Sequence, residues 1–418
     1  MSLVFVSMAV PLVSKDGHVK RSFYIASRRA RMLRCSRGPE RRSHEIQRIA
    51  RKTGGERSID KAFAIAASLP VGRWKHRSEG HPTRPDSARR VRSRQARLSL
   101  KDTQGMAHEL THVSFRNGAI ELAGDLRIPH GDDGQPPFPA VIIATPGSSV
   151  KEQIGANYAE RLTARGFVTL AFDPSYQGQS GGEPRDLEDP AARIEDIRCA
   201  VDYLMTVPAV DEERVGLLGI CAGGGYAVSA ALTEYRVKAL GTVVPVNIGR
   251  ARRQGGRTPD AIRDMLEAVG RQRTIEARGG APKREAWIPD TLDEAHAAGI
   301  TDPDLLDAVD FYRTPRGYSE HSTNRRIFTS LGPMMGFDAF HLVGELLIQP
   351  LQVIVAGRLG ATFSYADGQT LFERARNRRG FHVVQGAGHY DMYDKRPFID
   401  EAAEVLAAFF DKTLRDAG

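Results

Sequence analysis

The stretch of residues 214–225 limits what this chain can fold into more than any other part of the sequence. It predicts a short buried strand, then the turn Gly219-x-Cys221-x-Gly223, then a helix of small residues. A turn of this form is a nucleophile elbow, in which a reactive side chain stands on a strained bend between strand and helix. The two glycines are needed because side chains at those positions would collide with the crowded backbone.

The elbow carries a sulfur where a serine more often stands. The positive end of the following helix dipole favours a thiolate there, and the thiolate is the nucleophilic form of cysteine. We therefore expect Cys221 to be a catalytic nucleophile. The alternative is a glycine-rich turn that packs tightly or binds phosphate, with Cys221 as a small buried filler.

The charge of the chain is divided between two parts. Residues 1–105 hold 25 Lys and Arg against 8 Asp and Glu, whereas the remaining 313 residues hold 34 against 43. The net charge of +8 describes neither part, because an acidic body follows a strongly basic leader. The two parts are therefore interpreted separately.

The basic leader, residues 1–105, shows no sustained period of 2 or 3.6 and has a composition typical of disorder. Three interpretations are open: a tail that binds nucleic acid, a transit peptide, or a segment that is not part of the protein because translation starts at Met106. We favour the last, and expect a chain that begins at Met106 to keep full activity and stability. The apolar run Leu3–Val13 lacks a basic n-region and a clear cleavage site, so we expect no signal peptide.

The cysteines indicate the compartment. Cys35, Cys199 and Cys221 stand at unrelated spacings that match neither a disulfide framework nor a zinc site. This usage suits a reducing compartment, and we expect a cytoplasmic protein. The chain contains no run of 18 apolar residues, so the sequence predicts no membrane span. We expect no metal ion and no organic cofactor.

From residue 106 onward, strands and helices alternate. Eight strands are expected: Thr111–Phe115, Ala119–Ile128, Phe138–Thr145, Phe167–Asp173, the strand before Cys221, Val237–Val246, Leu351–Ala356 and Phe381–Gln385. The dipeptide Asn117-Gly118 predicts a hairpin between the first two. The alternation predicts a mostly parallel eight-stranded sheet with helices on both faces, opened by an antiparallel hairpin.

Residues 248–336 interrupt this alternation and separate the two core segments, 106–247 and 337–418. They show helical patterns but no convincing strand. An insertion at this point lies above the carboxyl edge of the sheet, where open α/β sheets hold their active sites. We interpret it as a helical lid that shapes the substrate pocket. The alternative is a loosely packed accessory bundle that does not contact substrate.

A thiol nucleophile needs a base, and the base needs a group that orients it. His389 follows directly on the last predicted strand, downstream of the elbow, and we expect it to be the base. The loop after Val355 usually supplies the orienting acid, but residues 357–362 contain no carboxylate. Asp367 is the first choice for this acid and Asp338 the second, and a different group, or none, is the remaining possibility.

The oxyanion of an acyl-transfer reaction needs two hydrogen-bond donors. The elbow itself supplies the backbone N–H of Ala222. We expect the backbone N–H of Ser148, in the loop after Thr145, to supply the second, although the Pro-Gly pair before it is also typical of a plain tight turn. The polar loop 173–182 is expected to support the site without reacting.

Four motifs together resemble the α/β-hydrolase superfamily and, within it, the dienelactone-hydrolase-like branch. They are Pro146-Gly-x₃-Lys-Glu-Gln153, Phe172-Asp-x₂-Tyr-Gln-Gly-x-Ser-Gly-Gly-x-Pro-Arg185, Gly219-Ile-Cys-Ala-Gly-Gly-Gly-Tyr-Ala227 and Gly386-Ala-Gly-His-Tyr-Asp-x-Tyr-Asp394. The resemblance covers residues 108–416 and implies an α/β-hydrolase fold. It matches Cys221 and His389 to the family's nucleophile and base.

Dienelactone hydrolases also carry a glutamate near the thiol, and Glu152 lies in a comparable loop. Two features depart from the family's pattern: the missing acid after Ala356 and the long insertion. The resemblance therefore implies the reaction class more firmly than the dienelactone substrate.

Taken together, the sequence predicts a hydrolase of an ester, lactone or thioester that works through an acyl-enzyme on Cys221. We expect a small-molecule acyl substrate as the partner, with no membrane and no nucleic acid, and leave a homo-oligomer open. One alternative is a C–C hydrolase or a lyase on the same fold, because fold does not fix chemistry. Another is a non-catalytic module whose basic leader binds nucleic acid.

Overall fold

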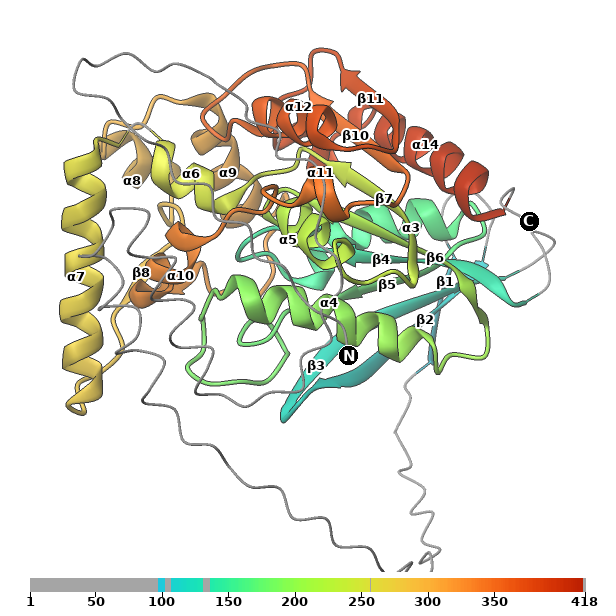
Figure 1. The fold of residues 1–418 in the computed structure, drawn as a ribbon, viewed down its shortest axis with the longest axis horizontal. Coiled ribbons are helices and arrows are strands. Elements are labelled where there is room, and N and C mark those ends of the chain that lie inside the picture. The colour runs from blue at the N-terminus through green and yellow to red at the C-terminus, as the bar shows by residue number, and fades with distance from the viewer. Residues whose placement is uncertain (1–96, 102–106, 131–135, 256, 416–418) are drawn as a thin grey trace, which may run out of the picture. The chain divides into compact units, whose positions relative to one another are not determined.

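Nine strands form one sheet within the described residues of the computed structural model, which are 97–101, 107–130, 136–255 and 257–415. Their order across the sheet is β1-β2-β3-β5-β4-β6-β7-β10-β11 (Figure 1). The strands are β1 (Arg97–Lys101), β2 (Ala107–Asn117), β3 (Ile120–Pro129), β4 (Phe138–Ala144), β5 (Val168–Phe172), β6 (Val210–Ile220), β7 (Val237–Val243), β10 (Leu351–Ala356) and β11 (Arg378–Val384).

All eight predicted strands are present, and the predicted fold class is confirmed. The pairs from β1 to β5 are antiparallel, and every pair from β5 to β11 is parallel. In the hairpin, Asn117 stands opposite Ile120, so Gly118 and Ala119 make the turn, with Gly118 at a φ of 56° that favours glycine. The ninth strand, β1, falls within the segment expected to be a leader; residues 1–96 and 102–106 lie outside the described part.

Helices cover both faces of the sheet, and the strands show why. Successive side chains of a strand point to opposite faces. In β4 the residues Ala140 and Ile142 join the apolar cluster that contains α4 (Pro190–Leu204), α5 (Ala222–Ala231) and α12 (Ser364–Arg374). Val141 and Ile143 join the cluster that contains α3 (Ala156–Thr163) and α14 (Phe398–Phe410). Every residue of β4 is buried, as expected for a central parallel strand.

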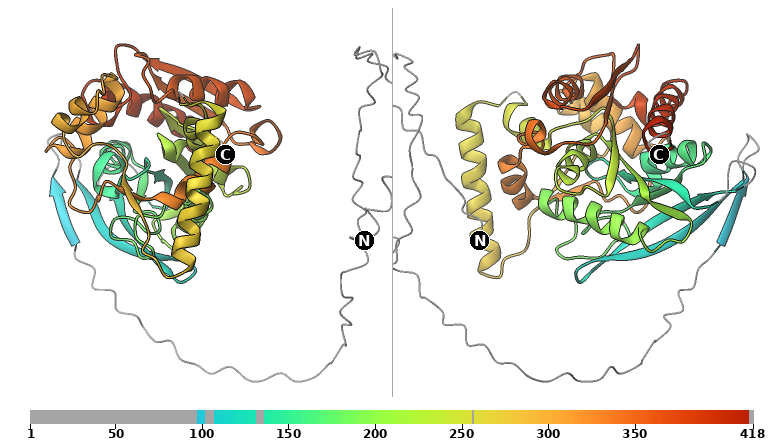
Figure 2. Two further views of the ribbon diagram at one scale, coloured as in Figure 1. Left: turned by 90° about the vertical axis from the view of Figure 1, so that its left-hand side faces the viewer. Right: turned by 45° about the vertical axis from the view of Figure 1, so that its right-hand side comes forward.

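The inserted segment consists mainly of helices. These are α6 (Ile248–Gln254), α7 (Pro259–Ala277), α8 (Leu292–Ala297), α9 (Pro303–Arg313) and α10 (Leu331–Gly336), with the 3₁₀ turn η2 (Phe328–Ser330). The yellow helix α7 runs along the outside of the unit in both views of Figure 2, and Val269 is its only buried residue. The expectation that this segment has no strand is wrong, because β8 (Arg284–Ala286) pairs with β9 (Arg325–Ile327). Strands of three residues are too short to show a period of 2 in the sequence.

The parallel strands bring their following loops to one edge of the sheet. The strands β4, β6, β7, β10 and β11 all end there, so the loops after Ala144, Ile220, Val243, Ala356 and Val384 gather at that edge. The shorter elements are η1 (Lys151–Gly155), α11 (Val343–Leu346), α13 (Asp391–Asp394) and η3 (Asp411–Arg415). In the described part of the chain, no helix is both long and apolar enough to cross a membrane.

Candidate active site

Cys221 occupies the predicted elbow between β6 and α5. Its backbone has φ 54° and ψ −123°, a strained conformation for a residue with a side chain. A Cβ at Gly219 would lie 2.6 Å from the Gly223 carbonyl oxygen, and a Cβ at Gly223 would lie 2.2 Å from the Ala144 carbonyl oxygen. Both positions therefore require glycine, and the elbow is held by close backbone packing. The thiol is partly buried at the carboxyl edge of the sheet.

His389 lies in the loop between β11 and α13, and its side chain is buried. Its Nδ1 atom lies 3.0 Å from the hydroxyl of Ser364, the first residue of α12. Its Nε2 atom lies 3.2 Å from the hydroxyl of Tyr393 in α13. Both ring nitrogens therefore have a hydroxyl partner within the protein.

The Tyr393 hydroxyl joins the thiol to the imidazole. It lies 3.2 Å from His389 Nε2, and its interaction with the Cys221 sulfur lowers the pKa of the thiol and raises its own pKa. Burial raises the pKa of Tyr393 well above its ordinary value, so this phenol stays protonated and can accept one proton while it donates another. The structure thus connects the predicted nucleophile and base through one intervening hydroxyl.

Tyr393 belongs to the motif of residues 386–394, but no role was expected for it from the sequence. The available signal is its spacing: four residues after His389, a side chain returns to the same side of a helical turn. Ser364 had no comparable signal, because it follows a different strand and reaches His389 only through the fold.

The electrostatics of the pair correct one expectation. Burial raises the pKa of Cys221 to about 11, although hydrogen bonds from Tyr393 and the Ala222 N–H and the charge of Arg193 act in the opposite direction. Burial also lowers the pKa of His389 to about 4. Both shifts favour a thiol and a neutral imidazole in the resting site, against the expected resting thiolate. The helix dipole does not compensate for the loss of hydration around the sulfur.

The two predicted oxyanion donors are the backbone N–H groups of Ala222 and Ser148. The interaction of the Ala222 backbone N–H with the Cys221 sulfur lowers the pKa of the thiol, against the larger effect of burial. Ser148 lies in the loop after β4 with a φ of 63°, in the left-handed region that a serine rarely adopts. The guanidinium of Arg193 is buried and donates to the carbonyl oxygens of Thr145 (3.2 Å) and Pro146 (2.8 Å), which fixes the start of this loop.

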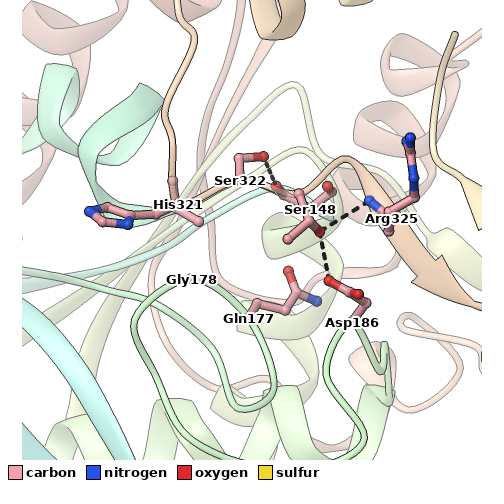
Figure 3. Close-up of a pocket in the computed structure, with 9 residues that line it drawn as sticks. Ser148, Gln177, Gly178, Asp186, His321, Ser322 and Arg325 are labelled. Atoms are coloured by element: carbon pink, nitrogen blue, oxygen red, sulfur yellow. Dashed lines mark hydrogen bonds between the residues drawn. The ribbon is translucent and has the colours of Figure 1, made fainter. Parts of the chain in front are cut away.

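Ser148 also lines a small pocket between the β4 loop, the loop after β5 and the inserted segment (Figure 3). The Ser322 hydroxyl donates to the Ser148 carbonyl oxygen at 3.0 Å, and the Thr323 hydroxyl donates to the Asp186 carboxylate at 2.6 Å. From the same segment, a ring carbon of Trp287 lies 3.1 Å from the point that a Cβ on Gly147 would occupy. The inserted segment therefore contacts the loop that carries the predicted donor.

The structure does not bring the predicted orienting acids to His389. The buried carboxylate of Asp367 accepts hydrogen bonds from the Asn247 N–H (2.9 Å) and from Arg250, including Nη2 at 2.6 Å. Asp338 accepts from the Asn247 side chain at 2.7 Å and from the Phe340 N–H at 3.1 Å. Asp367 is directed toward Arg250 because that cation is the partner its buried charge needs. The group at Nδ1 is instead Ser364.

Glu152 lies apart from these contacts and pairs with the ammonium group of Lys151. Lys151 is buried and also contacts Asp173 at 3.3 Å. Burial lowers the pKa of Lys151, but Asp173 and Glu152 raise it overall, so the lysine keeps its charge. Asp173 accepts from the backbone N–H of Lys151 and of Gln179, and this network ties the loop after β5 to η1. Within the described residues, no group of three or more His, Cys, Asp and Glu side chains could hold a metal ion.

Comparison with known proteins places this architecture in a family. Residues 127–246 match the dienelactone hydrolase family. The uncharacterised protein YcjY of Escherichia coli K12 is 36% identical over 321 residues, which are 74% of this chain and 100% of YcjY. A thiohydrolase of Eupenicillium brefeldianum is 27% identical over 286 residues, which are 67% of this chain and 88% of that protein.

A solved structure agrees with the fold over the same region. The crystal structure of the hypothetical protein PA2218 from Pseudomonas aeruginosa superimposes with a TM-score of 0.67 at 33% identity, and the match covers 76% of this chain and 100% of that one. The chain belongs to the dienelactone hydrolase family and is a hydrolase with the α/β-hydrolase fold.

Proposed function

We propose that this enzyme hydrolyses a carboxylic ester, lactone or thioester through a covalent acyl-enzyme on Cys221. The observation that carries the proposal is the position of the Tyr393 hydroxyl, which lies 3.2 Å from His389 Nε2 and interacts with the thiol of the Cys221 elbow. A nucleophile, a base and an oxyanion donor are the parts that acyl transfer needs.

Because thiol and imidazole are both neutral at rest, attack and proton transfer are coupled. The sulfur adds to the substrate carbonyl carbon while its proton passes to the Tyr393 oxygen and the Tyr393 proton passes to Nε2 of His389. The carbonyl π electrons become an oxyanion, held by the N–H groups of Ala222 and Ser148. When the tetrahedral intermediate collapses, the bond between the acyl carbon and the Cys221 sulfur remains and the bond to the leaving group breaks. The leaving group takes up the proton that His389 Nε2 returns through Tyr393.

Deacylation repeats these steps with water in place of the thiol. The neutral His389 accepts a proton from water through Tyr393, the resulting hydroxide adds to the acyl carbon, and the Cys221 sulfur leaves and regains its proton. Tyr393 is a neutral phenol before and after each step, because it gains one proton as it loses another. The high pKa of Tyr393 is consistent with this role of a neutral relay.

The substrate is a small acyl compound bound under the inserted segment. Contacts of Trp287 and Ser322 with the loop at Gly147 and Ser148 support the interpretation of that segment as a lid over the site. A thioester is the preferred class, since a relative with 27% identity is named a thiohydrolase.

Alkylation of Cys221 tests this proposal. The pure enzyme is expected to hydrolyse p-nitrophenyl acetate and a simple acyl thioester, and iodoacetamide is expected to remove both activities in proportion to the label on Cys221. Because burial raises the pKa of the thiol to about 11, the fraction of thiolate that iodoacetamide can alkylate, and with it the labelling rate, should keep rising with pH toward about 11. Peptide mass mapping separates Cys221 from Cys35 and Cys199. Full activity in enzyme that is completely labelled at Cys221 contradicts the proposal.

Tyr393→Phe tests the relay without removing the ring. It deletes only the hydroxyl between sulfur and imidazole, so kcat is expected to fall by about 10²-fold while the fold is kept. Tyr390→Phe is the matched control. The ring centroid of Tyr390 lies 4.9 Å from that of Tyr393, but no hydrogen bond joins Tyr390 to Cys221 or His389. Equal kcat values for the two variants would show that Tyr393 is not on the proton path.

A further inference from the structure

The loop after β10, which lacks an acid of its own, is occupied by an acid from the inserted segment. Asp304 stands in the first turn of α9 and is 1% exposed. Its Cγ atom lies 2.2 Å from the point that a Cβ on Gly360 would occupy. The missing side chain at Gly360 is therefore what makes room for the carboxylate at this position.

A run of hydroxyl groups links Asp304 to the imidazole. The Asp304 Oδ2 atom accepts from the Thr362 N–H at 3.2 Å and from the Thr362 hydroxyl at 2.7 Å. The Thr362 hydroxyl lies 3.5 Å from the Ser364 hydroxyl, the longest link of the run. The Ser364 hydroxyl in turn lies 3.0 Å from His389 Nδ1.

The hydrogen bonds of this run can all be donated in one direction, from His389 toward Asp304. If His389 is to accept a proton at Nε2, Nδ1 must carry the hydrogen and donate it to Ser364. Ser364 then donates to Thr362, and Thr362 donates to the carboxylate. This arrangement selects the tautomer that the proposed reaction needs, just as a directly bonded carboxylate does in a serine protease.

The charge of Asp304 is left unbalanced by the residues around it. No Lys, Arg or His forms an ion pair with it among the described residues, and its Oδ1 atom is buried without a hydrogen-bond partner. The nearby Arg358 pairs with Asp307 (2.8 Å) and Asp391 (3.4 Å). The charge of Asp304 raises the pKa of His389 against the larger opposing effect of burial. A buried anion of this kind is stabilised when a cation forms nearby.

We propose that Asp304 is the acid that positions His389 and stabilises its imidazolium form, acting from α9 through Thr362 and Ser364. This inference rests on the proposed function. It makes the inserted segment part of the proton-transfer machinery: α9 has to be seated against the β10 loop for the base to be fully active. Asp304 is a positioning residue, because it touches neither the thiol nor the imidazole.

Asp304→Asn tests the role of the charge, since the amide keeps the shape and can still accept from Thr362. We expect kcat for p-nitrophenyl acetate to fall by about 10²-fold with KM changed less than about twofold, because only the step that forms imidazolium needs the charge. Asp307→Asn is the matched control: it removes a carboxylate one turn further along α9 that has no link to His389. Its kcat is expected to equal that of the unmodified enzyme.

A second variant separates charge from packing. Asp304→Ala combined with Gly360→Asp returns a carboxylate to the β10 loop, close to where the original one stood, and is expected to recover part of the kcat lost in Asp304→Ala alone. A kcat for Asp304→Asn within about threefold of the unmodified enzyme overturns the proposal, as does an equal loss in Asp307→Asn or no recovery in the folded double variant. Because Cys221→Ala is measured beside these variants, its inactivity would show that the proposed function stands even if Asp304 has no part in it.

Discussion

Cys221→Ala is expected to lower kcat/KM for ester and thioester hydrolysis by about 10⁴-fold or more, because it removes the atom to which the acyl group is transferred. Cys221→Ser is expected to retain more activity than Cys221→Ala. In the proposed reaction the thiol acts from its protonated state and gives its proton to the base, and a serine hydroxyl can use the same base. Initial rates with p-nitrophenyl acetate over a range of concentrations measure both effects.

Cys199→Ala is the control for this experiment. Cys199 is also partly buried, but it lies in α4 and packs against the core. Its replacement should leave hydrolysis unchanged. Substantial esterase activity in Cys221→Ala, with a matching melting temperature, would assign the chemistry to another residue.

His389→Gln is expected to have the second largest effect, a loss of about 10³-fold in kcat, since neither attack nor deacylation then has a base. The rates of the unmodified enzyme and of His389→Gln should also depend differently on pH. In the unmodified enzyme the base is neutral above its pKa of about 4, so the rate should rise through that pH and then level off. In the variant only the thiolate can attack, so the residual rate should rise about tenfold per pH unit toward about 11.

Acid also affects folding, and the rates need correction for it. The pKa of His389 is about 4 in the folded protein against an ordinary 6.5, so between these values the unfolded chain binds more protons and stability falls as the pH is lowered. Circular dichroism at each pH gives the folded fraction for this correction. A flat pH profile in His389→Gln would contradict the assignment of His389 as the base.

The fold was predictable because its strongest signals are local. Long apolar runs such as Phe138–Ala144 mark strands that are buried on both faces, and their alternation with helices fixes a parallel sheet. The elbow was predictable for the same reason, since the glycines that backbone contact demands lie within two residues of Cys221. The strands β8 and β9 were not, because three residues carry no period and their pairing partners are about forty residues apart.

The site was predictable only in part. Cys221 and His389 could be proposed as nucleophile and base because each follows a strand at the carboxyl edge. Asp304 could not, because it lies in the inserted helix α9 and reaches the base through two hydroxyls from another loop. Asp367 was expected to orient His389 because of its place in the sequence. Its buried carboxylate pairs instead with Arg250, which lies in α6. The protonation state of the thiol depends on burial, which the sequence does not display.

The acyl-enzyme itself gives the most direct test of the central claim. The enzyme is mixed with p-nitrophenyl acetate, quenched with acid within milliseconds to seconds, and examined by intact mass spectrometry followed by peptide mapping. The account predicts one added acetyl group per chain, located on Cys221, that forms with the burst of p-nitrophenol and is absent in Cys221→Ala. Steady turnover with no acetylated protein at any time, or an acetyl group on a different side chain that forms and decays at the turnover rate, would contradict it.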